Sequence, residues 1–165
     1  ALYDERRHQV TGPGRPGTIF VFNGLSSAGY TDGGRKEIID GMVCTGDVGH
    51  FDDENLLFID GRDDEMIVSG GENVFPGEVE NLLNERSDVH DAAVIGVADS
   101  DFGQCLRAFI VPEPGIAIDP DEIRVYVRAN LARYKVPRDV TFVTELPRNA
   151  AGKLLRRQLE QVGTD

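Results

Sequence analysis

The sequence is poor in several residue types, and each scarcity excludes a class of protein. It has no tryptophan, three histidines and two cysteines, Cys44 and Cys105, which lie far apart in the chain. Neither the cysteines nor the histidines have the spacing of a zinc site, and two distant cysteines do not form a disulfide framework. Proteins without such a framework are typical of reducing compartments, so we expect a cytoplasmic protein.

Positive charge and long apolar runs are scarce as well. The 17 Lys and Arg residues face 29 Asp and Glu residues, which gives a formal net charge of -12. Binding to a nucleic-acid backbone or to an anionic membrane needs clustered cations, so we expect neither partner. The apolar segments are strand-sized, and none reaches the roughly 18 residues of a membrane span. An acidic chain can still bind a small phosphate ligand where a few cations and backbone N–H groups converge.

What the sequence does contain is enough apolar surface for a folded core. Of its 165 residues 40% are hydrophobic, and this length allows one domain, or a small domain with part of another. The first residues lack the apolar segment of a signal peptide, and the chain begins at Ala1 and not at an initiating Met. We therefore expect a fragment of a longer protein.

The first 60 residues are rich in glycine and in strand-like segments. Residues 18–22 and 56–60 are apolar strand candidates, and a polar, glycine-bearing loop is expected over residues 24–34 between them. No helical pattern here is long enough to cover such strands, and a few short strands do not fold alone. We expect the edge of a larger strand-rich domain, whose exposed strands could pair in a dimer of the fragment.

After Gly61 the pattern changes to alternating strands and helices. Asp119 and Pro120 form a strong helix start, because Asp caps the first turn and Pro fits its first position. The whole segment predicts an α+β module, a short mixed sheet flanked by helices. The expected helices are 76–86, 119–134 and a short one from 154, and the expected strands are 91–97, 106–111 and 140–143.

Two glycine-bearing motifs could contact a ligand. Thr45-Gly46-Asp47 lies in a predicted loop, where the carboxylate could accept hydrogen bonds from both hydroxyls of a ribose. Taken alone, an aspartate that stabilises its own turn is the simpler interpretation. Ser69-Gly70-Gly71-Glu72 lies in a predicted loop close before a helix, where a backbone can approach an anionic ligand closely. For this loop the functional and the structural interpretation both stay open.

Two charged motifs are equally ambiguous when taken singly. Gly61-Arg62-Asp63-Asp64-Glu65 falls where the composition changes, which is typical of a hinge but also of a charged turn. Lys153 is one of three lysines and ends a polar loop over residues 147–153. A lysine can deliver a compact point charge to a site, although a solvated surface residue is the simpler interpretation.

The order of these motifs is more specific than any one of them. It resembles the C-terminal third of the adenylate-forming (ANL) acyl-CoA synthetase superfamily, and it is most similar to bacterial fatty-acid–CoA ligases. The resemblance implies that residues 1–61 are the end of the large N-terminal, AMP-binding domain, with a strand-rich part of its β-barrel. Residues 62–165 would be the small, mobile C-terminal domain. The segments that carry the resemblance are residues 45–47, 61–64, 69–80 and 147–153.

The resemblance also implies roles for individual residues. Asp47 would bind the ribose hydroxyls of ATP and AMP, and Arg62 would lie near the same ribose. Asp64 would be the hinge about which the small domain swings between two half-reactions.

Two further roles fall in the small domain. Lys153 would enter the site for the first half-reaction, the formation of an acyl-adenylate. The loop that lines the pantetheine tunnel in the second half-reaction would be formed by Ser69, Gly70, Gly71 and Glu72.

The implied reaction joins a carboxylic acid, first a medium- or long-chain fatty acid, to CoA with ATP and Mg²⁺. The partners would be the acid, ATP, CoA and the enzyme's own N-terminal domain. The family's Gly-, Ser- and Thr-rich phosphate loop is missing from this sequence, so we expect the chain alone to be inactive. Aryl acids stay open as substrates. So do two alternatives: an enzyme that loads a carrier protein or stops at the adenylate, and a non-catalytic interaction module.

Overall fold

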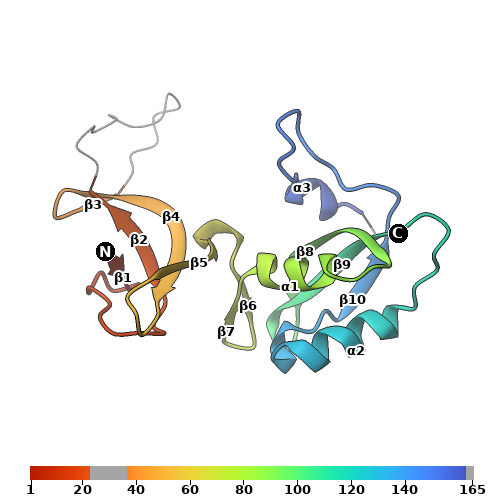
Figure 1. Cartoon of the computed structure of the whole chain (residues 1–165), viewed down its shortest axis with the longest axis horizontal. Helices are drawn as coiled ribbons and strands as arrows, with labels where there is room; N and C mark the ends of the chain where they lie inside the picture. Colours follow the sequence, from red (N-terminus) through yellow and green to blue (C-terminus); the bar gives the residue numbers. More distant parts are fainter. Residues whose placement is uncertain (23–36, 163–165) are drawn as a thin grey trace. The chain divides into compact units, whose positions relative to one another are not determined.

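The computed structural model describes residues 1–22 and 37–162 (Figure 1), so the loop expected over residues 24–34 lies outside the described residues. The chain divides into two compact units, Ala1–Glu65 and Met66–Asp165. Each unit is described by itself.

In its described residues, unit 1 is a five-stranded antiparallel sheet centred on strand β4. Strand β4 pairs with β2 along one edge and with β3 and β5 along the other. Leu2, Val10 and Ile19 form its small core, against which Phe51 packs. The two predicted strands, 18–22 and 56–60, are present as β2 and β5 with shifted ends. The strands are β1 (Leu2–Tyr3), β2 (Gly17–Val21), β3 (Ile38–Ile39), β4 (Met42–Phe51) and β5 (Leu57–Arg62).

The Thr45-Gly46-Asp47 motif lies inside β4, so its predicted placement in a loop is wrong. Gly and Asp are both depleted in strands, which is why the sequence alone favoured a turn. Pairing overrides that preference here, because Cys44 pairs with Phe20 on β2 while Asp47 pairs with Arg62 on β5.

Unit 2 is built on a second five-stranded sheet. Strands β8 and β9 form a long antiparallel hairpin, and β10 runs parallel to β9, so the sheet is mixed as predicted. Strand β6 meets β9 at one end and pairs with β7. The strands are β6 (Ile67–Ser69), β7 (Glu72–Val74), β8 (Val89–Asp99), β9 (Gly103–Pro112) and β10 (Asp139–Phe142).

The helices of unit 2 begin near their predicted positions but are shorter than predicted. In α2, Asp119 caps the first turn by accepting a 2.8 Å hydrogen bond from the Asp121 N–H. The helix ends at Asn130, whose side-chain amide donates to the Tyr126 carbonyl, and Leu131 is already extended. The helices are α1 (Pro76–Asn84), α2 (Pro120–Asn130) and α3 (Arg156–Leu159), with 3₁₀ turns η1 (Asp63–Glu65) and η2 (Arg133–Lys135).

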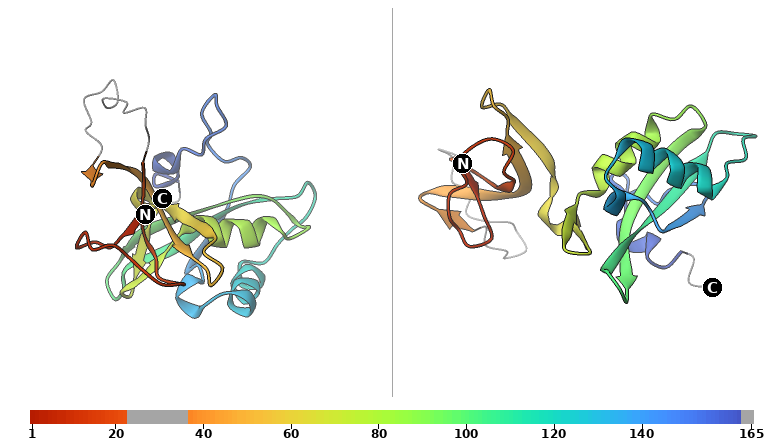
Figure 2. Two further views of the ribbon diagram at one scale, coloured as in Figure 1. Left: turned by 60° about the vertical axis from the view of Figure 1, so that its left-hand side comes forward. Right: turned by 90° about the horizontal axis from the view of Figure 1, so that it is seen from below.

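The unit 2 sheet is buried on both faces. Ala92 and Val94 on β8 face the cluster under α1 and α2, while Ala93 and Ile95 face the opposite side. On that side Leu146, Leu154 and Leu159 from the C-terminal segment cover Phe109. The right-hand view of Figure 2 shows α1 and α2 on one side of the sheet and α3 on the other. No helix in the described part of the chain combines the length and apolarity of a membrane span.

Replacing Phe109 tests the importance of the second face. Its side chain is fully buried, so Phe109→Ala should lower the free energy of unfolding by about 3–5 kcal/mol, measured by urea unfolding followed by circular dichroism. Val125→Ala on α2, where the side chain is 63% exposed, should change it by no more than about 0.5 kcal/mol. Equal effects of the two variants would contradict the described core.

Candidate functional site

Three of the sequence-predicted site residues come together in unit 1. Arg62 lies opposite Asp47 on neighbouring strands, and its Nη1 donates to Asp47 Oδ1 at 3.4 Å. Its Nε donates to Asp64 Oδ1 at 3.1 Å. The hydrogen bond to Asp64 and the charge of that carboxylate raise the pKa of Arg62, and Asp47 adds to the effect. All three side chains are open to solvent to some degree, so a ligand can reach them.

The rest of the Thr45-Gly46-Asp47 motif fixes the position of Asp47. Thr45 Oγ1 accepts a 3.0 Å hydrogen bond from the Asp47 N–H and donates to the Ile19 carbonyl. Gly46 has a φ of 82°, a value that glycine adopts readily, and a Cβ at this position would lie 3.3 Å from Arg62 Nη2. The motif therefore brings a carboxylate and a guanidinium close together. The carboxylate keeps acceptor positions for the hydroxyls of a diol.

The expected linker over residues 61–65 is ordered structure. Gly61 and Arg62 end β5, and residues 63–65 form the 3₁₀ turn η1, directly before the boundary between the units. Asp64, the predicted hinge residue, thus lies within that turn and carries the ion pair with Arg62.

Gly70 and Gly71 form the two-residue turn of the β6–β7 hairpin, with Ser69 and Glu72 paired on either side. Their φ values of 61° and 86° are typical of a type I′ turn, which strongly favours glycine. The Gly70 N–H donates to the Phe102 carbonyl at 3.0 Å. The predicted loop close before a helix is therefore wrong: β7 separates this turn from α1, and the turn presents backbone with no side chain.

Lys153 ends a hydrogen-bonded turn between β10 and α3. The Asn149 side chain accepts hydrogen bonds from the Ala151 and Lys153 N–H groups, and the Asn149 N–H donates to the Lys153 carbonyl. A bridge between Arg148 and Leu154 closes the turn, which is why α3 begins at Arg156 and not at Leu154 as predicted. The Lys153 side chain is exposed.

The structure does not bring all the predicted residues together. Asp47, Arg62 and Asp64 belong to unit 1, while the glycine turn and Lys153 belong to unit 2. Within unit 2, Figure 1 shows the segment between β10 and α3 at the opposite end from the β6–β7 hairpin. Unit 2 therefore presents the glycine turn and the lysine at two separate places.

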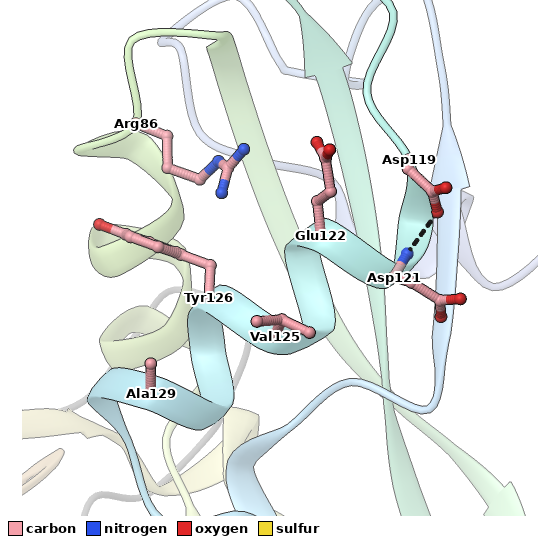
Figure 3. Close-up of a pocket in the computed structure, with 7 residues that line it drawn as sticks. All are labelled: Arg86, Asp119, Asp121, Glu122, Val125, Tyr126 and Ala129. Carbon is pink, nitrogen blue, oxygen red and sulfur yellow. Dashed lines mark hydrogen bonds between the residues drawn. The ribbon is translucent and has the colours of Figure 1, made fainter.

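A shallow hollow on α2 contains none of these residues (Figure 3). Two of its polar side chains, Arg86 and Asp119, already have structural roles. Arg86 lies over the Tyr126 ring at 4.9 Å and pairs with Asp88, whose hydrogen bond raises the pKa of Arg86. Asp119 caps α2. Among residues 1–22 and 37–162, no group of three His, Cys, Asp or Glu side chains could hold a metal ion.

Paired glycine substitutions test the hairpin turn. Gly70→Ala should lower the free energy of unfolding by about 1–2 kcal/mol, because alanine resists a positive φ. A Cβ there would also lie 3.0 Å from Phe102 Cδ1. Gly77→Ala, in α1 with no atom within 4 Å of the added Cβ, should raise it by about 0.4–1 kcal/mol. Urea unfolding of both variants checks the opposite signs, and equal signs would contradict the turn geometry.

Residues 78–153 match the family described as AMP-binding enzyme C-terminal domain. The chain is 39% identical over 161 residues to the 2-succinylbenzoate–CoA ligase of Geobacillus sp. (strain WCH70), covering 96% of this chain and 33% of that protein. It is 36% identical over 168 residues to the long-chain-fatty-acid–CoA ligase of Bacillus subtilis (strain 168), covering 100% of this chain and 30% of that protein.

A solved structure shows a matching similarity in fold. The amide bond synthetase McbA from Marinactinospora thermotolerans superposes with a TM-score of 0.86 at 32% identity, over 99% of this chain and 34% of that one. The chain thus spans about a third of the length of these relatives. Residues 78–153 of this chain thus carry the C-terminal domain of the AMP-binding enzymes, and the chain is similar to acyl-CoA ligases of the adenylate-forming superfamily.

Proposed function

We propose that this chain is the C-terminal part of an ATP-dependent, cytoplasmic acid–CoA ligase. Residues 1–61 would end its AMP-binding domain, and residues 62–165 would be the small mobile domain. The observation that carries the proposal is the Asp47–Arg62 pair, which lies immediately before the boundary between the units. A carboxylate beside a guanidinium suits a ribose with a phosphate attached, because the first accepts hydroxyls and the second attracts phosphate oxygens.

The proposed reaction has two steps. The acid attacks the α-phosphate of ATP, which gives an acyl-adenylate and pyrophosphate, and the CoA thiol then displaces AMP to give the acyl-CoA. Mg²⁺ would accompany the ATP phosphates. Negative charge accumulates on the phosphate oxygens in the first step, so a positioned Lys153 would stabilise its transition state.

The separation of two features on unit 2 supports a mechanism in two conformations. The glycine turn and the Lys153 turn lie at opposite ends of the unit (Figure 1), so one orientation presents only one of them to a given site. Rotation about Asp64 would exchange them. The side-chain-free turn at Gly70 and Gly71 would then leave room for the narrow pantetheine arm of CoA.

Exposed apolar side chains on unit 1 support the proposal that another domain covers this surface in the longer enzyme. Large apolar side chains are exposed on and beside β2, β3 and β5, and an exposed apolar patch of this kind is typical of an interface. We propose that the enzyme's own large domain covers it. The exposed residues are Val21, Phe22, Ile38, Leu56, Leu57, Phe58 and Ile59.

A fatty acid is our first proposal for the substrate, since the motifs around Gly61 to Glu80 resemble fatty-acid–CoA ligases. One named relative is a ligase for 2-succinylbenzoate and the other a ligase for long-chain fatty acids. An aryl acid is therefore our second proposal for the substrate. The likeness to an amide bond synthetase favours one further candidate, an enzyme that passes its acyl group to an acceptor other than CoA.

Replacing Lys153 tests the proposed half-reactions. In the longer enzyme that contains this chain, Lys153→Ala should slow acyl-adenylate formation by about 10²- to 10³-fold, since one preorganised charge is lost. Conversion of preformed acyl-adenylate to acyl-CoA should be spared. Pyrophosphate release and thioester formation measure the two steps, and a panel of acids names the substrate.

Two variants control this experiment. Lys153→Arg keeps the charge, and Arg157→Ala removes an equal charge from an exposed position on the neighbouring helix. Full adenylation by Lys153→Ala would overturn the assignment. Accumulation of adenylate without acyl-CoA, or transfer to a carrier protein or an amine, would favour the alternative acceptors.

Replacing Asp47 tests the ribose contact. Asp47→Ala in the same enzyme should raise the KM for ATP about tenfold or more, because a charge-assisted hydrogen bond to the ribose is lost. The exposed Asp53→Ala, in the turn before β5, should leave this KM unchanged. Similar values for the two variants in steady-state kinetics would contradict the proposed contact.

A further inference from the structure

Arg148 joins the tip of the Lys153 turn to the sheet of unit 2. Its Nη1 donates to the Gly152 carbonyl at 3.0 Å, one residue before Lys153. Its Nη2 donates to Asp91 Oδ2 on strand β8 at 2.8 Å. Asp91 is held in turn, because its Oδ1 accepts from the Ala92 N–H at 3.0 Å. One guanidinium therefore connects the backbone beside the lysine to a fixed point on the central hairpin.

The other contacts of this segment act at different places. Asn149 shapes the turn from within, through hydrogen bonds to the Ala151 and Lys153 N–H groups. The base of the segment is held by burial of Leu146 and Leu159 against the sheet.

Arg156 adds a polar anchor at the same base. Its Nη2 donates to Glu80 Oε2 on α1 at 3.1 Å, and its Nη1 donates to the Val94 carbonyl. The base is thus attached by buried leucines and by this ion pair, whereas Arg148 reaches the tip itself.

We propose that Arg148 and Asp91 are positioning residues for Lys153 in acyl-adenylate formation, an inference that rests on the proposed function. Lysine is a point charge on a flexible stem, so where its ammonium group lies depends on where its backbone is held. Displacement of a catalytic group by about 1 Å can cost about 10²-fold in rate. Arg148 reduces this freedom by fixing Gly152.

The exposure of the pair separates positioning from general stability. The side chains of Arg148 and Asp91 are 43% and 26% exposed, and ion pairs of this kind contribute little to folding. The leucines and the Glu80–Arg156 pair hold the base without them. Loss of Arg148 should therefore loosen the turn while unit 2 stays folded.

Half-reaction kinetics in the longer enzyme test the proposal. Arg148→Ala and Asp91→Ala should each lower kcat for pyrophosphate release about tenfold, with little change in the KM for ATP. Conversion of preformed acyl-adenylate to acyl-CoA should stay within about twofold, the usual scatter of a surface substitution. The double variant should be no slower than the single ones, since both remove one interaction.

Matched variants complete the design. Arg148→Lys keeps the charge but cannot reach Gly152 and Asp91 together with a planar fork, so its rate should lie between wild type and Arg148→Ala. Arg157→Ala removes the same charge nearby and should leave both half-reactions unchanged. An equal fall in both half-reactions, or multiplied effects in the double variant, would overturn the positioning role.

Hydrogen exchange separates this inference from the proposed function. Mass spectrometry of the same enzyme should show faster exchange over residues 149–153 in Arg148→Ala but not in Arg157→Ala. Unchanged exchange would overturn the inference whatever the activity. Faster exchange in an enzyme that makes no acyl-adenylate would instead overturn the proposed function. The catalytic role of the Arg148–Asp91 contact would then fall with it.

Discussion

The β8–β9 hairpin is the element on which the rest of unit 2 depends. Its register runs from Asp91 opposite Val111 to Asp99 opposite Gly103, and successive side chains point to opposite faces. Because both faces are apolar, both must be covered. Helices α1 and α2 cover one face, and the C-terminal segment covers the other. The place of the Lys153 turn is thus a consequence of burying the second face of a hairpin that lies much earlier in the chain.

Local ion pairs hold the arginines of the candidate site, although the chain as a whole is strongly acidic. The net charge of -12 repels anions at long range, so a nucleotide would gain no general attraction from the protein's field. Two arginines at or near the candidate site are held by carboxylates, Arg62 by Asp47 and Asp64, and Arg148 by Asp91. Such pairs orient a cation, and they also lower the net charge that a ligand meets. Recognition of phosphate would therefore depend on short contacts more than on steering.

Much of the fold could be predicted from local signals. Asp119 and Pro120 mark a helix start because capping and a fixed φ act within one turn, and the helix begins there. The end of α2 could not be predicted, because it depends on the Asn130 side chain competing for a helix carbonyl. Strand β4 was missed for a similar reason. Its central Gly46 and Asp47 have low strand propensity, and partners on β2 and β5, which are distant in the sequence, hold them extended.

The candidate site, too, could be predicted from the sequence only in part. The order of the motifs predicted Asp47, Arg62, Asp64 and Lys153 as site residues, but the Asp47–Arg62 register depends on an irregularity at Val48 and Gly49 that no local pattern reveals. The Arg148–Asp91 contact joins residues that are far apart in the chain, and in the sequence Asp91 was only the start of a strand. Asn149, three residues before Gly152, was the one signal that could have indicated an ordered turn there, since Asn commonly bonds to its own backbone two residues on.

The side-chain-free turn at Gly70 and Gly71 has one more consequence. Backbone amides do not ionise in the range of pH where enzymes work, so hydrogen bonds made by this turn keep the same strength across that range. The two ends of unit 2 therefore differ in kind: the Gly70–Gly71 turn offers backbone dipoles without a side chain, whereas the Lys153 turn offers a side-chain charge on a flexible stem.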